Sequence, residues 1–499
     1  MQSGAQKETH HAASVASGAE RRKSACSHSG SGYRVSYGQH GSIRKSPLGL
    51  LELPPRGGIL CQTSYDLGQG RDHPFPVFTH GAPRKWDSRG RQQCSRGSRT
   101  SYLWRSQQMN ATPPAEPAPT AKGDGGPLAH LFIADVDVHV HDDPGALAPY
   151  CDPPWDDALR ELTHVHERYL DIPGFAIGWE GIDPPIPGRI PGVEDAGDHP
   201  DWETRVVRSA DQLRSELSAL HIDAAIVFPD NLLTLGALAN PRYACALASA
   251  YNRWIEAEWL DVDRGLHAAL VVAPHDPREG AAEIARWADR SGFAAIYLPT
   301  AAVNPPWGHA MYDPIYDAAQ EAGLPVVFHS VGIIHPNFPH NVHAFSPAGV
   351  RHALLHPLGM ITSLMSLIGS GVPARFPRLK VVFTEGGVSW VPFVAWRLDR
   401  EYLERRREFP FYSEPPSHYV RQFFFSTQPI EEPEDPRLLV QLIEACPGAD
   451  HILFASDWPH HDFDHPRVIS RLPFTHEQKA AVLGETALEL FRLRSGSGG

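Results

Sequence analysis

Two histidines one residue apart, His139 and His141, are the residues whose type and spacing most clearly suggest chemistry. They close the run Asp135–His141, at the end of an apolar stretch that begins at Leu131. Side chains of an extended strand alternate between its two faces, so both imidazoles point the same way and can bind one cation. Neutral imidazole is the commonest nitrogen ligand of metals. The pair predicts half of a metal site, although two structural histidines on a half-buried strand would give the same motif.

Further metal-competent side chains lie downstream, most of them directly after an apolar run. They are His329, Glu385, Asp457 and, three residues later, His460. Three histidines with Asp457 make a nitrogen-rich, partly anionic ligand set that leaves an open position for water or a substrate oxygen. A metal there lowers the pKa of bound water or polarises a carbonyl, and Asp457 is predicted to act as both ligand and general base. Glu385 stands where a second cation or a proton relay would be placed.

The elements that must position these residues are short apolar runs alternating with helical patterns. The predicted strands are 131–139, 223–228, 267–273, 293–298, 325–329, 380–384, 422–426 and 451–455. The predicted helices are 209–219, 241–260, 278–291, 312–322, 347–370, 390–407, 436–445 and 475–493. Strands that are almost continuously apolar are typical of parallel sheets covered by helices on both faces.

Eight such units predict an α/β fold, the (β/α)8 barrel. A doubly wound open sheet is the alternative, but it calls for a glycine-rich phosphate loop after the first strand, and the sequence has none there. The active site of a barrel is built at the carboxyl ends of its strands. All the candidate ligands follow predicted strands, and we therefore expect them on one rim.

Composition and charge divide the chain into two parts. The whole chain has 499 residues, 42% hydrophobic and 21% charged, which is typical of a globular protein. Residues 1–108 hold 16 Lys and Arg against 6 Asp and Glu, whereas the rest is acidic. We expect residues 1–128 to be a disordered basic leader with a Pro/Ala linker, Met109 to be an alternative start, and residues 129–495 to form the barrel.

Composition and charge also indicate which binding partners and which cellular compartment to expect. The basic residues of the leader are dispersed, without an amphipathic period or a signal-peptide core, which speaks against binding of nucleic acid and against targeting. No apolar run approaches the roughly 18 residues of a membrane span. The six cysteines lack CxxC spacing, so we expect neither disulfides nor a thiolate zinc site, and a cytoplasmic location. A small-molecule substrate is the expected partner.

Five motifs resemble the amidohydrolase-related family, the branch of the metal-dependent amidohydrolase superfamily that includes aminocarboxymuconate-semialdehyde decarboxylase. They are DVDVHVH (135–141), PVVFHS (325–330), FPRLKVVFTEGGVSWVPFVAWRLDREY (376–402), FFFSTQPIEEP (423–433) and ILFASDWPHHDFD (452–464). The resemblance implies a (β/α)8 barrel with metal bound by His139, His141, His329 and Asp457. It also implies a site position after the sixth strand, where the decarboxylases carry a water-activating histidine and this chain has Glu385.

That difference leaves several functions open. The first is a hydrolase or decarboxylase that acts on a small carboxylated or ring-containing substrate through a metal-activated water, most simply with one zinc ion. The second is a monooxygenase with two iron ions that hydroxylates a hydrophobic, terpenoid-like substrate, with Glu385 and His460 as further ligands. The adjacent His461 offers one more imidazole. The third is a barrel with a purely structural metal, which an open coordination position would argue against.

Two loops are expected to shape the substrate site. Residues 142–202, dense in Pro, Gly, Trp and Asp, follow the first strand and are predicted to form a lid. Residues 331–345 follow the fifth strand and carry His335, His340 and His343, of which we expect at least two to be surface histidines. The apolar helix 347–370 is expected to pack on the barrel, and its outer side would suit a homodimer.

Overall fold

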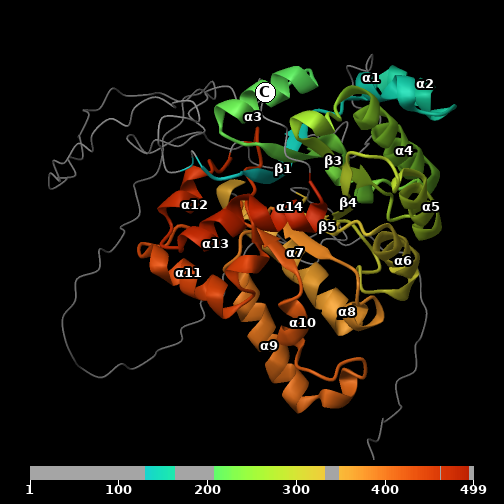
Figure 1. Cartoon of the computed structure of the whole chain (residues 1–499). Coiled ribbons are helices and arrows are strands. Elements are labelled where there is room, and N and C mark those ends of the chain that lie inside the picture. Colours follow the sequence, from blue (N-terminus) through green and yellow to red (C-terminus); the bar gives the residue numbers. More distant parts are fainter. Residues whose placement is uncertain are drawn as a thin grey trace, which may run out of the picture. The chain divides into compact units, whose positions relative to one another are not determined.

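Eight parallel strands form one sheet whose order follows the sequence. Figure 1 shows the computed structural model of the chain, with helices around the labelled strands. The structure describes residues 128, 130–162, 207–331, 345, 348–460 and 462–493. The strands are β1 (Ala134–Val140), β2 (Ala224–Pro229), β3 (Leu266–Val271), β4 (Phe293–Pro299), β5 (Val326–His329), β6 (Val381–Thr384), β7 (Phe424–Ser426) and β8 (Ile452–Leu453). Past β8 the chain returns to β1, where Val136 N–H donates to the carbonyl of Phe454 over 3.1 Å and Val138 bridges Trp458. The predicted (β/α)8 barrel is confirmed.

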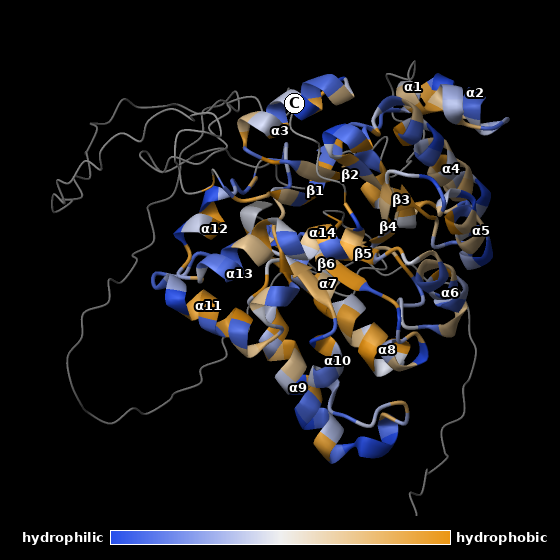
Figure 2. Cartoon of the chain, in the orientation of Figure 1, coloured by the Kyte–Doolittle hydropathy of each residue, from blue (hydrophilic) through white to orange (hydrophobic). Residues whose placement is uncertain are grey.

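The strands are buried because helices cover one face and the barrel interior covers the other. Every residue of β1, β2, β3, β4, β5, β6 and β8 is buried, as their almost uninterrupted apolar sequences predict. Aromatic rings pack between the strands and the helices: Phe383 stacks on Phe328, with ring centroids 5.4 Å apart, and on Phe425, at 5.5 Å, and both Phe383 and Phe425 contact Trp390 of the helix that follows β6. Figure 2 shows apolar colour on the labelled strands β3, β4, β5 and β6, whereas the helices around them mix apolar and polar residues.

The helices begin where the sequence supplies a capping residue. They are α1 (Pro144–Leu147), α2 (Trp155–Leu162), α3 (Ala210–Ala219), α4 (Pro241–Glu258), α5 (Pro277–Trp287), α6 (Asp313–Ala322), α7 (Ala348–Gly369), α8 (Val372–Arg375), α9 (Trp390–Glu404), α10 (Pro416–Val420), α11 (Pro436–Ala445), α12 (Arg467–Arg471), α13 (His476–Ala480) and α14 (Thr486–Phe491). Asn240, Asp276 and Asp435 each accept a backbone N–H from the first turn of the helix that follows, with proline as its first residue. This cap-and-proline pattern fixes where α4, α5 and α11 start.

The predicted helix 475–493 is interrupted. A π-helical turn, Ala481–Glu485, separates α13 from α14. Gly484 lies in this turn, where an added Cβ would stand 2.4 Å from the carbonyl oxygen of Phe132. Only glycine allows the helix to approach the strand-one segment so closely, and the turn seats the last helix against the barrel.

Helix α7 differs from the expectation that no segment could span a membrane. Within the described residues it is the one helix that passes on length and composition, with mean hydropathy 1.2 over Gly349–Gly369. Its residues Met360, Leu364 and Leu367 are fully buried in the protein core. Because a core helix passes the same test, the finding is weak evidence for a membrane span.

Some predicted segments lie outside the described residues. They include the leader 1–127, Met109, the greater part of the predicted lid, 163–206, and the loop histidines His335, His340 and His343. The described start of the lid, residues 142–162, contains α1 and α2.

Candidate metal centre

Four buried side chains converge at the rim of the barrel. Asp137 and His139 lie on β1, His329 ends β5, and Asp457 follows β8. The ligand atoms of Asp137, His139 and His329 all lie within 4.8 Å of one another, and so do those of His139, Asp457 and His460. The prediction that the ends of strands one, five and eight meet is therefore confirmed for His139, His329 and Asp457. The metal ligation of these residues stays a prediction.

The hydrogen bonds of the two histidines fix which ring nitrogens can bind a cation. His139 Nδ1 lies 2.7 Å from the carbonyl oxygen of Pro229, and His329 Nδ1 lies 2.7 Å from that of Ser330. A carbonyl oxygen only accepts, so both Nδ1 atoms carry the proton and both Nε2 atoms present a lone pair. A neighbouring carbonyl is a typical outer partner of a metal-binding histidine.

These lone pairs face carboxylate oxygens. The Oδ1 atom of Asp137 is 2.9 Å from His329 Nε2 and 3.3 Å from His139 Nε2, and Asp457 Oδ1 is 3.1 Å from the latter. His139 Nε2 and Asp137 Oδ2 are buried and make no hydrogen bond with the described residues. Lone pairs of this kind, converging in a buried space, repel one another unless a proton or a metal ion lies between them. The donor set of two imidazoles and two carboxylates fits a divalent metal.

The electrostatics of the cluster also call for positive charge. Burial lowers the pKa of His139, but the carboxylates of Asp137 and Asp457 outweigh burial and raise this pKa well above its ordinary value. Burial raises the pKa of Asp457, whereas His460 and His139 outweigh it, so that the pKa lies below the usual range and the carboxylate stays ionised. The site thus stabilises cations in a place from which water is largely excluded.

The predicted pairing of His139 with His141 does not occur. Strand β1 ends at Val140, so His141 lies beyond the alternation of the strand; its side chain is 40% exposed and its Nδ1 is 3.1 Å from Asp230 Oδ2. The second group that β1 contributes is Asp137, which sequence reasoning missed. The signal was present, because the period of two that aligns His139 with His141 also aligns His139 with Asp137.

Asp135 lies on the same face of β1 as Asp137 and His139, and it anchors the loop after β8 by hydrogen bonds. Its carboxylate accepts the backbone N–H of Ser456 over 2.9 Å and also the hydroxyl of that residue. The next residue, Asp457, donates its N–H to the carbonyl of Asp137 over 3.0 Å. Asp457 has a left-handed backbone, with φ of +60°, which is uncommon for a residue other than glycine. These bonds hold the strained residue beside β1.

Glu385 lies next to the cluster but joins neither metal-competent group. It too has positive φ, +69°, and it is buried directly after β6. Its Oε2 is 3.2 Å from His329 Nδ1, and its Oε1 is 3.6 Å from Nδ1 of His356, a buried residue of α7 that sequence reasoning did not single out. Burial, with the negative charges of Asp457 and Asp137, raises the pKa of Glu385 well above its usual value.

His460 connects the cluster to the surface. Its Nδ1 donates to Asp457 Oδ1 over 2.7 Å, and its ring stacks on that of His139 with centroids 4.3 Å apart. On the far side, its Nε2 lies 3.5 Å from Oδ1 of Asp230, the residue that also contacts His141. Burial lowers the pKa of His460, but Asp457 outweighs it and raises the pKa to about 10. His461, the neighbouring imidazole, lies outside the described residues.

Asp142 positions Asp230 in turn. This buried carboxylate accepts the backbone N–H groups of Asp230, Asn231 and Leu232 over 2.7 to 3.0 Å. His141, which was predicted to be a ligand, lies at the outer end of a line of alternating carboxylates and imidazoles. That line runs from Asp457 through His460 and Asp230 to His141.

Comparisons with known proteins identify the family and the fold. The sequence profile of the amidohydrolase family matches residues 136–493. A gamma-resorcylate decarboxylase from Polaromonas sp. is 24% identical over 326 residues, which are 62% of this chain and 89% of that protein. The crystal structure of 5-carboxyvanillate decarboxylase from Sphingomonas paucimobilis superposes with a TM-score of 0.54 at 21% identity, over 73% of this chain and 100% of that one.

A third protein, dihydroxybenzoic acid decarboxylase from Polaromonas sp., was solved with bound manganese and the inhibitor 2-nitroresorcinol. It superposes with a TM-score of 0.50 at 16% identity, over 73% of this chain and 97% of that one. The two structural likenesses establish the barrel fold, and the profile match covers the whole barrel. The chain is therefore an enzyme of the amidohydrolase family.

Proposed function

We propose that this enzyme is a metal-dependent decarboxylase that removes carbon dioxide from an aromatic or similarly conjugated carboxylic acid. The observation that carries the proposal is the cluster of Asp137, His139, His329 and Asp457 at the barrel rim. Support comes from the relatives, since a gamma-resorcylate decarboxylase matches along 89% of its length. A decarboxylase of the same fold was solved with bound manganese. Manganese is therefore a candidate metal in addition to the expected zinc.

The cluster would hold one divalent ion through Nε2 of His139 and His329 and the carboxylates of Asp137 and Asp457. Bound there, the ion would supply the positive charge that anchors the substrate carboxylate and an adjacent oxygen. All four side chains are buried, so the ion would meet the substrate in a place with little competing water, which strengthens its attraction for a carboxylate.

The reaction exchanges a proton for carbon dioxide. When the bond from carbon to the carboxylate breaks, its electron pair stays on the ring carbon, and one proton must reach that carbon. We assign this proton to the hydrogen bond between His460 Nδ1 and Asp457 Oδ1. Glu385, buried with a raised pKa, would stay protonated and donate a hydrogen bond to a substrate oxygen. The two-iron monooxygenase finds no support in the comparisons, and we do not carry it forward.

The test uses the full chain loaded with manganese or zinc. It is incubated with hydroxybenzoates labelled in the carboxyl carbon, and the release of labelled carbon dioxide is measured by mass spectrometry. Amides, esters and lactones of the same acids are assayed in parallel, with metal-stripped protein as the control. We expect carbon dioxide from an acid only when metal is present. Hydrolysis of the esters or lactones without carbon dioxide from any acid would overturn the proposal in favour of a hydrolase.

A further inference from the structure

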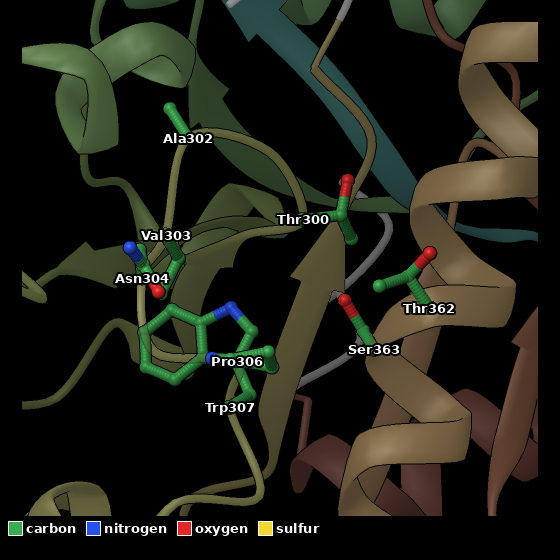
Figure 3. A pocket seen from close by; sticks show the side chains of 8 residues that line it. All are labelled: Thr300, Ala302, Val303, Asn304, Pro306, Trp307, Thr362 and Ser363. Carbon is green, nitrogen blue, oxygen red and sulfur yellow. The ribbon is translucent and has the colours of Figure 1, made fainter. Parts of the chain in front are cut away.

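The loop after β7, residues 427–431, reaches the metal centre through the side chain of Gln428. This loop belongs to the motif FFFSTQPIEEP (423–433), whose polar residues have no part in the proposed reaction. A cavity of about 200 Å³ between the loop after β4 and helix α7 (Figure 3) has neither a histidine nor a carboxylate among its described lining residues. The loop after β7, by contrast, contacts Asp457 directly.

The side-chain amide of Gln428 can adopt only one orientation. Its Nε2 lies 3.3 Å from Oδ2 of Asp457 and 3.3 Å from the backbone carbonyl oxygen of Asp462. Because Asp457 stays ionised, both oxygens accept hydrogen bonds and neither donates one. The amide nitrogen must therefore face them, and the amide oxygen, Oε1, must point away from them.

The amide oxygen of Gln428 lacks a partner. The side chain is fully buried, and Oε1 makes no hydrogen bond with the described residues. A buried acceptor without a donor destabilises a folded protein, so a glutamine placed for stability alone would pair both ends of its amide. The bond that Gln428 donates to Asp457 is thus kept at the expense of stability, which points to a role in the site.

This bond fixes how the carboxylate of Asp457 is turned. While Oδ2 accepts from Gln428, Oδ1 accepts from His460 Nδ1 over 2.7 Å and lies 3.1 Å from His139 Nε2. The last torsion of an aspartate has a broad, roughly twofold energy profile. Without a partner for Oδ2, the carboxylate would turn and either oxygen could face the cluster. The amide therefore keeps Oδ1 toward the two imidazoles.

The backbone that carries Gln428 is itself held on two sides. Its carbonyl accepts the N–H of Gly387, in the segment after β6, over 3.3 Å. The hydroxyl oxygen of Thr427 accepts the N–H of Ala455, in the segment after β8, over 3.2 Å. The loop after β7 thus joins the segments that carry Glu385 and Asp457, and it places the amide with little freedom.

We propose that Gln428 is a positioning residue of the metal centre, which donates its amide to Asp457 Oδ2 and so presents Oδ1 to the ion and to His460. The inference rests on the proposed metal-dependent function, in which Asp457 is both a ligand and a partner in proton transfer. It concerns the orientation of one ligand and is independent of which acid the enzyme acts on.

The test replaces Gln428 by methionine, which keeps a similar volume and removes the amide. Metal-stripped full chain is titrated with manganese chloride by calorimetry, and we expect Gln428→Met to raise the dissociation constant about ten- to a hundredfold. At saturating manganese, the electron paramagnetic resonance spectrum of the bound ion should also change, because Asp457 no longer meets it in one orientation. Gln428→Asn, whose shorter side chain withdraws the amide, should behave alike and serves if methionine prevents folding.

Thr427→Val is the matched control, because it removes a buried hydrogen bond from the same loop without touching the carboxylate of Asp457. It should lower the midpoint of chemical unfolding but leave the manganese affinity and the spectrum at their wild-type values. Equal losses of affinity in Thr427→Val and Gln428→Met would reduce Gln428 to a support of the loop and overturn the proposal. Wild-type affinity and spectrum in both Gln428 variants would also overturn it.

The outcomes separate this inference from the proposed function. If Gln428→Met weakens manganese binding as expected but the wild-type enzyme releases no carbon dioxide from any acid, decarboxylation fails and the positioning role stands. If the wild-type chain binds no manganese, both are refuted.

Discussion

Replacing Asp137 by asparagine should sharply weaken metal binding. The carboxylate is fully buried, and its Oδ1 stands 2.9 Å from His329 Nε2 and 3.3 Å from His139 Nε2, where it would share one ion with them. Removing one charged partner from a buried pair costs about 3–5 kcal/mol, and each 1.4 kcal/mol is about tenfold in a dissociation constant. We therefore expect Asp137→Asn to raise the dissociation constant for manganese roughly a hundred- to several-thousand-fold.

His141→Ala is the matched comparison, because the motif alone would make His141 the ligand. Its side chain is 40% exposed and pairs with Asp230, and an exposed ion pair is worth about 0–1 kcal/mol. We expect the affinity for manganese to change less than about fivefold. Titration of metal-stripped protein, followed by competition with a chelator, measures both variants. A loss with His141→Ala as large as that with Asp137→Asn, or wild-type affinity in the latter, would refute the assignment.

Three further predictions follow from single side chains. His460→Gln should lower kcat more than KM while metal content stays at the wild-type level, because the imidazole beside the ligands is lost; unchanged kcat in steady-state assays would exclude the proton role. Burial raises the pKa of Asp464 from 3.8 to about 7. The ionised carboxylate is therefore less stable in the folded protein than in the unfolded chain, and the free energy of unfolding falls as the pH rises between these two values. Chemical unfolding should then show Asp464→Asn more stable than wild type at pH 8 by up to about 4 kcal/mol and similar at pH 4; a constant difference would contradict this. Gly484→Ala, whose Cβ would meet Phe132, should cost about 1–3 kcal/mol of unfolding free energy, whereas Gly349→Ala has open space and should cost nothing; equal effects would remove the close approach from the account.

The barrel was predictable because each of its strands appears in the sequence as a separate apolar run. Each of the eight predicted strands corresponds to an observed one, and each helix start with a cap and a proline, such as Asn240 before α4, carries its own signal. The last helix could not be predicted as interrupted, since the π-helical turn at Gly484 depends on the position of Phe132, which is distant in sequence.

The site was predictable to the extent that it follows from strand ends. His329 and Asp457 were found because His329 ends an apolar run and Asp457 comes two residues after another, and the barrel brings those ends together. His141 lies apart from His139 because β1 ends at Val140, and nothing in the sequence marks that end. His356 and Asp230 were missed because their positions near the site depend on tertiary packing. His356 reaches the site from one face of α7, and Asp230 reaches it from the turn after β2.

The most direct test of this account is the number of divalent metal ions bound per chain. Elemental analysis and native mass spectrometry of protein reconstituted with manganese or zinc, and then freed of excess ion, give this number. A single centre built from Asp137, His139, His329 and Asp457 predicts one ion per chain, lost in His329→Ala. No bound ion, or one ion retained in that variant, would contradict the centre, and two ions would show that Glu385 belongs to a second one.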